Sequence, residues 1–518
     1  MAFSTVSISS KLGIGAAILV VALILAALLA VLWRAEFSSG LGPADWSAIR
    51  FTALQATMSA VLSTLLAIPV ARALARRRFR GRGLLVTLLG APFILPVIVA
   101  VLGLLAVFGR AGWLNAGLAQ VGLAPVSIYG LHGVVLAHVF FNLPLATRLL
   151  LQAWQTIPAE RFRLAAQMNL PPHAVFRSIE VPLLRQILPG TAALIFVICL
   201  TSFAVALTLG GGPSATTVEL AIYQAFRFDF DLSRAAQLSL VQLGIAGGTA
   251  ALALWIIPTV SIGGGFDRSL HRWDAQGGLQ RVLDILAIGL TTAFLSLPLA
   301  AVVIRGLAGL AETPAAVWHS AGVSIIVALI SIVVLLSIAL PMAGWIVTRP
   351  RGGSEAVGLL GLAASPLTIG TGWFILINPV ADPFALALPV TALINAFMAL
   401  PFVLRIIVPP MRDTVQVYGR LTQTLGLGGW LLWRWMILPR LRPQIGFAAG
   451  LTGALSMGDL GVIALFASPD TVTLPLQMYR LMGAYRMDAA AGAALILLAL
   501  SLGIFWIFDK GGRWHAQA

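Results

Sequence analysis

The segment RLAAQMNLPPHAVFRSIEVP, at residues 163–182, recurs in altered form as RLTQTLGLGGWLLWRWMILP at residues 420–439. The first arginine, the leucine after it and the final proline are identical at an offset of 257 residues. The same offset holds for a short stretch upstream, in which Leu143, Pro144 and Arg148 match Leu400, Pro401 and Arg405. A polar segment that is duplicated within an apolar chain predicts two equivalent docking elements on one side of a membrane, and hence a partner with two-fold symmetry.

The composition indicates a membrane protein. Hydrophobic residues make up 59% of the 518 residues and charged residues only 10%, which leaves too little polar surface to cover a soluble globule of this size. The net charge of +15 would favour nucleic acid as the partner of a soluble domain. Here the arginines stand between apolar spans, where positive loops orient a membrane protein. We therefore expect contact with a lipid bilayer and no binding of nucleic acid.

Twelve windows of the chain are long and apolar enough to cross a bilayer, since a spanning helix needs roughly 20 mostly apolar residues. The expected fold is therefore an all-α polytopic membrane protein with about 12 spans. The windows lie near residues 12–33, 51–72, 84–108, 128–150, 186–209, 235–258, 282–304, 318–347, 356–377, 386–408, 444–467 and 489–508.

Lysine and arginine are distributed unequally between the two ends of these spans. The chain has 33 of them, and one side receives at least three times as many as the other. The positive-inside rule places the richer side in the cytoplasm, together with both termini and both repeated segments. The arginines of the poorer side are Arg34, Arg50, Arg110, Arg227, Arg234, Arg305, Arg480 and Arg486.

A hydrophilic linker at residues 263–280 divides the chain into two halves, residues 1–262 and 281–518. Each half holds six windows. Because six is even, the second half enters the membrane in the same direction as the first. This predicts two parallel six-helix repeats related by an axis along the membrane normal.

Each repeated segment, taken as residues 157–182 and 415–439, is predicted to be a helix–turn–helix element. Asn169 in the first copy and Gly426 in the second suit the turn, and an apolar stripe at helical spacing follows each turn. Such a stripe fits either a helix lying on the membrane surface or a knob in the groove of a cytoplasmic partner. The duplication favours the second interpretation.

The spacing resembles the EAA loop in permease subunits of binding-protein-dependent ABC importers, where glycine, phenylalanine, isoleucine and proline follow the EAA triplet at fixed distances. The resemblance implies that both segments dock on a separate ATPase. The chain departs from the pattern at the family's glutamate, which is Arg163 and Arg420 here, so we expect a different, acidic counter-surface on that ATPase. The implied coupling residues are Ala165, Ala166, Asn169, Leu170, Phe176, Ile179, Pro182, Leu421, Gly426, Trp433, Met436 and Pro439.

Longer runs at residues 129–152, 201–225 and 458–466 resemble the fused permease of the thiamine importers. The resemblance implies a multi-pass protein of the bacterial inner membrane. It would receive thiamine or its phosphate esters from a periplasmic binding protein and move them by alternating access. ATP and Mg²⁺ would bind to a homodimeric ATPase and no cofactor to this chain. Fused iron(III) permeases are the nearest rivals, and sulfate and molybdate permeases are more distant.

Three polar residues are candidates for the substrate path. Asp459 is an ionisable residue near membrane depth, which is a functional hypothesis by default, and Ser202 is its counterpart at the offset of 257. The carboxylate would attract the thiazolium cation of thiamine or bond to neighbouring backbone. Glu219 is expected in an external loop, where it would steer a cation or solvate a surface that touches the binding protein.

Other classes of protein are less consistent with the sequence. His132 and His138 are six residues apart, on opposed faces of a helix, so they do not form a metal pair. A secondary transporter would show inverted repeats or charges paired within its spans. No GxxxxGK[ST] motif occurs, so ATP hydrolysis is expected on another subunit and the chain is not itself an enzyme.

Overall fold

The computed structural model describes residues 7–36, 40–90, 94–212, 215–256, 277–348, 364–468 and 471–514. All regular elements in these ranges are helices, and nine of the described helices are long and apolar enough to cross a membrane. The predicted all-α, polytopic fold is therefore confirmed. Most of the predicted linker lies outside the described residues, and its last part is helical, because a helix begins at Gly278.

The helices of the first half come before that linker and those of the second half after it. The first half contains α1 (Ser7–Arg34), α2 (Pro43–Arg76), α3 (Arg82–Leu88), α4 (Val97–Phe108), α5 (Trp113–Gln120), α6 (Leu131–Gln155), α7 (Ala159–Gln167), α8 (Pro172–Val175), η2 (Phe176–Glu180), α9 (Val181–Leu200), α10 (Phe203–Leu209), α11 (Val218–Arg227) and α12 (Leu232–Ile256). The second half contains α13 (Gly278–Gly309), η5 (Leu310–Glu312), α14 (Ala315–Thr348), α16 (Pro366–Ile377), α17 (Ala387–Thr424), α18 (Gly429–Leu432), η6 (Trp433–Ile437), α19 (Leu438–Met457), α20 (Gly461–Phe466), α21 (Leu474–Gly483) and α22 (Met487–Arg513).

Helices and contacts repeat between the halves. The elements α8, η2 and α9 recur 257 residues later as α18, η6 and α19. The helices α2 and α14 both have 34 residues. At the end of α2 nearest α11, the Val218 amide donates to Thr52 Oγ1 at 2.9 Å. In the second half the Leu474 amide donates to Ser324 Oγ at 2.8 Å. The same local arrangement has therefore formed twice.

The first helix of each half packs against the other half. The helix α1 lies against α14 and α16, and α13 lies against α2 and α4. Two glycines permit the closest approaches, as small residues do between membrane helices. A Cβ on Gly372 of α16 would lie 2.2 Å from the Ala27 carbonyl oxygen of α1, and one on Gly103 of α4 would lie 2.6 Å from the Pro298 carbonyl oxygen of α13. The halves are therefore interlocked by reciprocal exchange.

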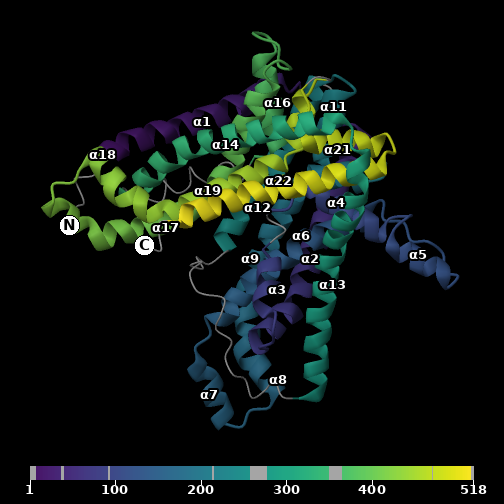
Figure 1. Cartoon of the computed structure of the whole chain (residues 1–518), viewed down its shortest axis with the longest axis vertical. Coiled ribbons are helices and arrows are strands. Elements are labelled where there is room, and N and C mark those ends of the chain that lie inside the picture. The colour runs from purple at the N-terminus through teal and green to yellow at the C-terminus, as the bar shows by residue number, and fades with distance from the viewer. Residues whose placement is uncertain are drawn as a thin grey trace.

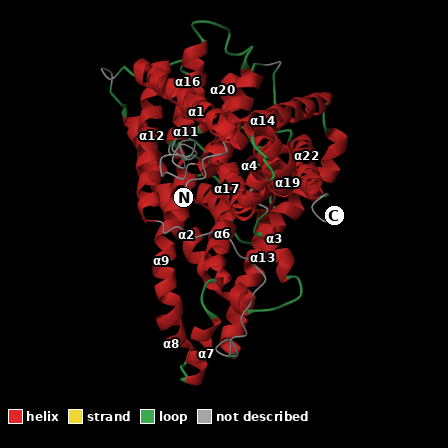
Figure 2. Cartoon of the chain, turned by 90° about the vertical axis from the view of Figure 1, so that its left-hand side faces the viewer, coloured by secondary structure: helices red, strands yellow, loops and turns green. Residues whose placement is uncertain are grey.

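Two arms diverge from a common end that carries α11 and α21 (Figure 1). One arm holds α2, α6, α9 and α13 and ends at α7 and α8, as Figure 2 also shows. The other arm holds α1, α14, α17, α19 and α22. It ends at α18, near the first and last described residues. The two repeated segments therefore lie at the ends of different arms.

Candidate coupling segments and substrate path

The first coupling segment, residues 157–182, has a well-defined turn. The helix α7 ends in two hydrogen bonds: the Leu170 amide donates to the Ala165 carbonyl at 3.1 Å and the Asn169 amide donates to the Ala166 carbonyl at 3.0 Å. Asn169 has a φ of 54°. This is the Schellman arrangement, in which a left-handed residue ends a helix. The turn predicted at Asn169 is confirmed.

The second coupling segment, residues 415–439, has the same turn. The Leu427 amide donates to the Thr422 carbonyl at 2.9 Å, and Gly426 has a φ of 64°. One difference precedes the turn. Pro158 separates α6 from α7 in the first half, whereas its counterpart Val415 lies inside the uninterrupted 38-residue helix α17.

A π-helical turn follows each short helix and directs the predicted apolar stripe inward. Phe176 lies under the Arg72 guanidinium, whose Cζ is 4.5 Å from the ring centre. Ile179 and Trp433 are partly buried against the hydrophobic core, and Met436 is buried. These four side chains pack against helices of this chain, so they hold the segments in place. Their direct contact with an ATPase stays a prediction.

The apolar side chains that do face outward form a second pair in each copy. Leu164 and Met168 are 57% and 63% exposed, and their counterparts Leu421 and Leu425 are 53% and 62% exposed. Residues four apart lie on one helix face, so each segment presents a matching apolar spot. Of these four, the sequence analysis named only Leu421. The repeated i, i+4 spacing was the signal that could have identified the others.

Exposed arginines occur at equivalent positions in both segments. The Arg163 side chain is 77% exposed and lies 4.0 Å from Glu160, and its counterpart Arg420 is also exposed. Arg177 and Arg434 are exposed beside the π-helical turns. Each segment therefore combines an exposed apolar spot with exposed arginines, which suits a partner surface that carries both apolar and acidic groups.

The other predicted coupling residues differ in exposure. Ala165 is buried. Asn169, Pro182 and Gly426 are exposed, whereas Ala166, Leu170 and Pro439 are partly buried.

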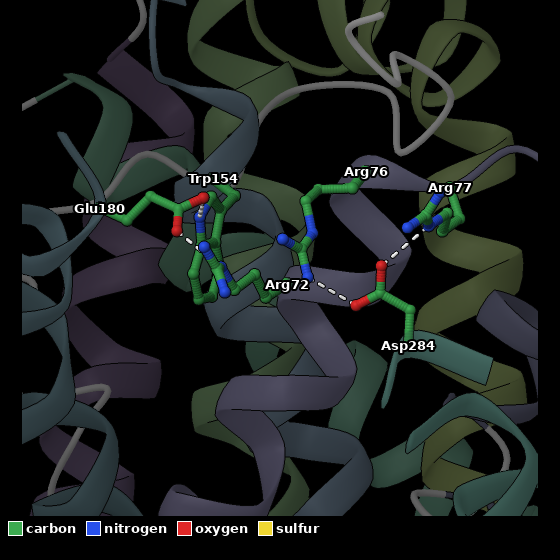
Figure 3. Close-up of polar contacts among 6 residues, drawn as sticks. All are labelled: Arg72, Arg76, Arg77, Trp154, Glu180 and Asp284. Atoms are coloured by element: carbon green, nitrogen blue, oxygen red, sulfur yellow. Dashed lines mark hydrogen bonds and ion pairs between the residues drawn. The ribbon is translucent and has the colours of Figure 1, made fainter. Parts of the chain in front are cut away.

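A carboxylate inside the first segment binds it to α2. Glu180, in η2, is fully buried; Arg72 Nε donates to its Oε2 at 2.6 Å and Trp154 Nε1 to its Oε1 at 3.3 Å (Figure 3). Buried charges are retained only when they are paired and hydrogen-bonded. The ring of Phe176 also packs against the Arg72 guanidinium. These contacts join η2, α2 and α6.

A second buried carboxylate binds α2 to the exchanged helix α13. Asp284 is 3% exposed, and its carboxylate accepts from Arg76 at 2.5 Å and from Arg77 at 2.8 Å (Figure 3). The sequence analysis counted these arginines only as orienting charges. Glu180 and Asp284 are acidic residues in otherwise basic regions. This was the signal that some of the arginines have structural partners.

Two predicted spans are broken at equivalent places. The chain leaves helix between α9 and α10 at Thr201 and Ser202, and again between α19 and α20 at residues 458–460. The breaks lie together, because a Cβ on Gly461 would be 3.7 Å from the Phe203 ring. Discontinuous helices at a repeat interface are where membrane transporters commonly bind their substrates. Ser202 and Asp459 therefore stand at the two adjacent helix breaks.

Glu219 is not in an external loop, contrary to expectation. It lies in the first turn of α11 and is fully buried. Thr217, the residue before α11, caps this helix, since its hydroxyl accepts from the Leu220 amide. Because α11 packs against both α10 and α20, Glu219 is on a helix beside the two breaks. In the described residues, no group of three or more His, Cys, Asp or Glu is arranged to hold a metal ion.

The Asp459 carboxylate caps the N-terminus of α20. It accepts from the amides of Gly461 at 3.2 Å, Val462 at 3.3 Å and Ile463 at 3.4 Å. We expect Asp459→Ser to keep most of the transport activity, because serine also caps helices, and Asp459→Ala to lower the free energy of unfolding by about 1 kcal/mol. Thermal unfolding and uptake of both variants test this. Equal loss of uptake in the two variants, with unchanged unfolding, would instead support a role for the charge.

Comparison with known proteins identifies the family. No family model matches the chain. A thiamine transport system permease protein of Escherichia coli is 40% identical over 516 residues, covering 96% of both chains. One of Brucella abortus is 40% identical over 492 residues, covering 91% of this chain and 89% of the relative. One of Haemophilus influenzae is 34% identical over 498 residues, covering 92% and 90%. These matches confirm the family resemblance, and the chain belongs to the thiamine transport system permease proteins.

Proposed function

We propose that this chain is the permease of an ATP-driven importer that moves thiamine, or its phosphate esters, from a periplasmic binding protein into the cytoplasm. The relatives support the substrate, since those matched over nearly their whole length are thiamine permeases by name. An iron(III) importer is not favoured by these relatives. The observation that supports coupling to an ATPase is the pair of matching exposed spots, Leu164 with Met168 and Leu421 with Leu425.

The duplication of these spots supports a homodimeric ATPase, because two equal subunits offer two equal grooves. The two spots lie at the ends of different arms (Figure 1). When the ATPase dimer closes on ATP, it draws the arm ends together and shifts access from the cytoplasm to the loaded binding protein. Hydrolysis resets the arms. Near-complete switching requires that the free energy of ATPase binding differ by about 5 kcal/mol between the two access states of the permease.

The proposed orientation in the bacterial inner membrane places both termini in the cytoplasm. Support comes from the start of α1 and the end of α22, which lie at the same end of the bundle as the second coupling segment (Figure 1). A Cβ on Gly13, near the start of α1, would touch Pro341 near the end of α14, and Gly446 in the first half of α19 lies against Gly512 near the end of α22. Lys510 and Arg513 lie in the last turn of α22, on the side that the positive-inside rule assigns to the cytoplasm.

We place the substrate path at the two helix breaks and assign Ser202, Asp459 and Glu219 to its surroundings. Irregular backbone is tolerated at membrane depth where it is covered by protein or lines a path. The breaks at equivalent positions put the N-termini of α10 and α20 next to each other.

Reconstitution tests the proposed substrate. We expect vesicles that contain this permease and its ATPase to take up labelled thiamine only when ATP is inside and the binding protein outside. Unlabelled thiamine should abolish the signal, whereas ferric ion should leave it unchanged. Uptake of labelled iron(III) by the same vesicles, or competition of thiamine uptake by ferric ion, would contradict the assignment.

A further inference from the structure

The two coupling segments are joined to their arms in different ways. The second is the end of α17, a 38-residue helix that runs without a break from the arm into the segment. The first is cut off from α6 at Thr156 and Pro158. A continuous helix transmits displacement along its axis, whereas a break between helices can bend. The first segment does run on through η2 into α9, within one helix from Pro172 to Leu200. On the α6 side, however, it needs another connection if it is to follow the ATPase as the second segment does.

The buried Glu180 supplies that connection. It ties η2 to Arg72 of α2 and to Trp154 of α6 (Figure 3). The second half has no equivalent, since its matching residues carry no charge. At the offset of 257, the counterparts of Trp154 and Glu180 are Met411 and Ile437. The helices α2 and α14 have equal length and start 272 residues apart, so the counterpart of Arg72 is Gly344.

The same turn of α2 also holds the other half. Arg76 lies one helical turn beyond Arg72, and it shares the Asp284 carboxylate of α13 with Arg77. In the other arm, the exchanged helix α1 lies against α14. A Cβ on Gly13 of α1 would lie 2.3 Å from the Pro341 carbonyl oxygen of α14. The counterpart of Arg77 lies outside the described residues.

From these contacts we infer that the importer transmits the motion of the ATPase by two unequal routes. In the second arm the route is the continuous helix α17. In the first arm it is an ionic relay, in which Glu180 passes the motion of the segment to Arg72, and Arg76 passes that of α2 to Asp284. Removing one partner of a buried ion pair leaves an uncompensated charge, so the linked elements move as one body. This inference rests on the proposed ATPase coupling.

A double variant tests the relay without leaving a charge unpaired. Arg72→Met with Glu180→Gln removes the ion pair, while the new amide oxygen can still accept from Trp154. In proteoliposomes with the ATPase and binding protein, we expect ATP hydrolysis within about twofold of the wild type. Thiamine moved per ATP should fall roughly tenfold, within the usual range of coupling between sites. Arg72→Lys keeps the charge but loses the planar group over Phe176, so it should restore that ratio only in part.

The matched control lies in the second half. Met411→Leu with Ile437→Val changes the equivalent positions conservatively and should leave thiamine per ATP unchanged. An unchanged ratio in the relay variant would overturn the inference but not the proposed function, which fails only if the ATPase does not bind the exposed spots. Loss of ATPase binding in the relay variant would also overturn it, because the pair would then shape the docking surface. If that variant does not fold, Arg76→Met with Arg77→Met and Asp284→Asn tests the other link with the same expected result.

Discussion

A permease in which Leu164 and Leu421 are both replaced by aspartate is expected to insert normally into the membrane and to lose its binding to the ATPase. Both side chains are more than half exposed, so their replacement removes little packing within this chain. In the complex each aspartate would bring a carboxylate into an apolar contact. Loss of a hot-spot contact costs about 2 kcal/mol, so loss of one in each segment corresponds to roughly a thousandfold in Kd. Co-purification of the ATPase and thiamine uptake should both fall to background.

The repeat provides a control for this variant. Val417 lies one turn before Leu421 and is 68% exposed, and its counterpart in the first segment is Glu160. The first copy therefore already carries an acid at this position. Val417→Glu should leave Kd within about threefold, as expected for residues outside the centre of an interface. Retention of the ATPase by the double aspartate variant, or its equal loss from Val417→Glu, would show that docking lies elsewhere.

The sequence predicted the features that depend on local chemistry. Apolar windows identify spans because a bilayer demands about 20 apolar residues in a row. The turns at Asn169 and Gly426 were predictable because few residues adopt a left-handed conformation. The family was recognisable from long runs of sequence. These features need no knowledge of which helices touch.

The outward face of the coupling segments was not predictable by the same means. Helical periodicity places Phe176 and Ile179 on one face but does not say whether that face points toward the chain or away from it. The π-helical turns make the problem harder. Their i to i+5 hydrogen bonds widen the helix, so faces counted at 3.6 residues per turn change direction at Phe176 and again at Trp433. The exposed pair Leu164 and Met168 comes before this change.

Two larger features also escaped the sequence analysis. The breaks at Ser202 and Asp459 lie inside continuous apolar windows, and hydropathy does not register a change of backbone direction. The exchange of α1 and α13 between halves is a non-local contact, determined by which helix surfaces fit. Its only trace in the sequence is a set of glycines inside spans, and glycine is frequent in membrane helices in any case.

Valine at the two exchange contacts is expected to destabilise the folded permease. At Gly372 the added Cβ would lie 2.2 Å from a backbone oxygen of α1, and at Gly103 2.6 Å from one of α13. Backbone atoms cannot rotate aside, so helices must separate, and overpacking of this kind costs about 3 kcal/mol per site. Thermal unfolding in detergent, followed by size-exclusion chromatography, measures the loss.

The helices on the other side of these contacts provide matched controls. Gly15 of α1 and Gly289 of α13 have open space where a Cβ would stand, so valine there should leave the unfolding temperature almost unchanged. Equal stability of Gly372→Val and Gly15→Val would mean that the exchange is not a tight contact. Because Gly103 and Gly372 make matching contacts in the two halves, valine should lower stability by similar amounts at both. The relay variants, in contrast, are expected to change thiamine per ATP through the first arm alone. Equal effects of the two valines, together with an effect of the relay variants, are therefore the result expected if the exchanged helices stabilise both halves while the proposed route from the ATPase differs between the arms.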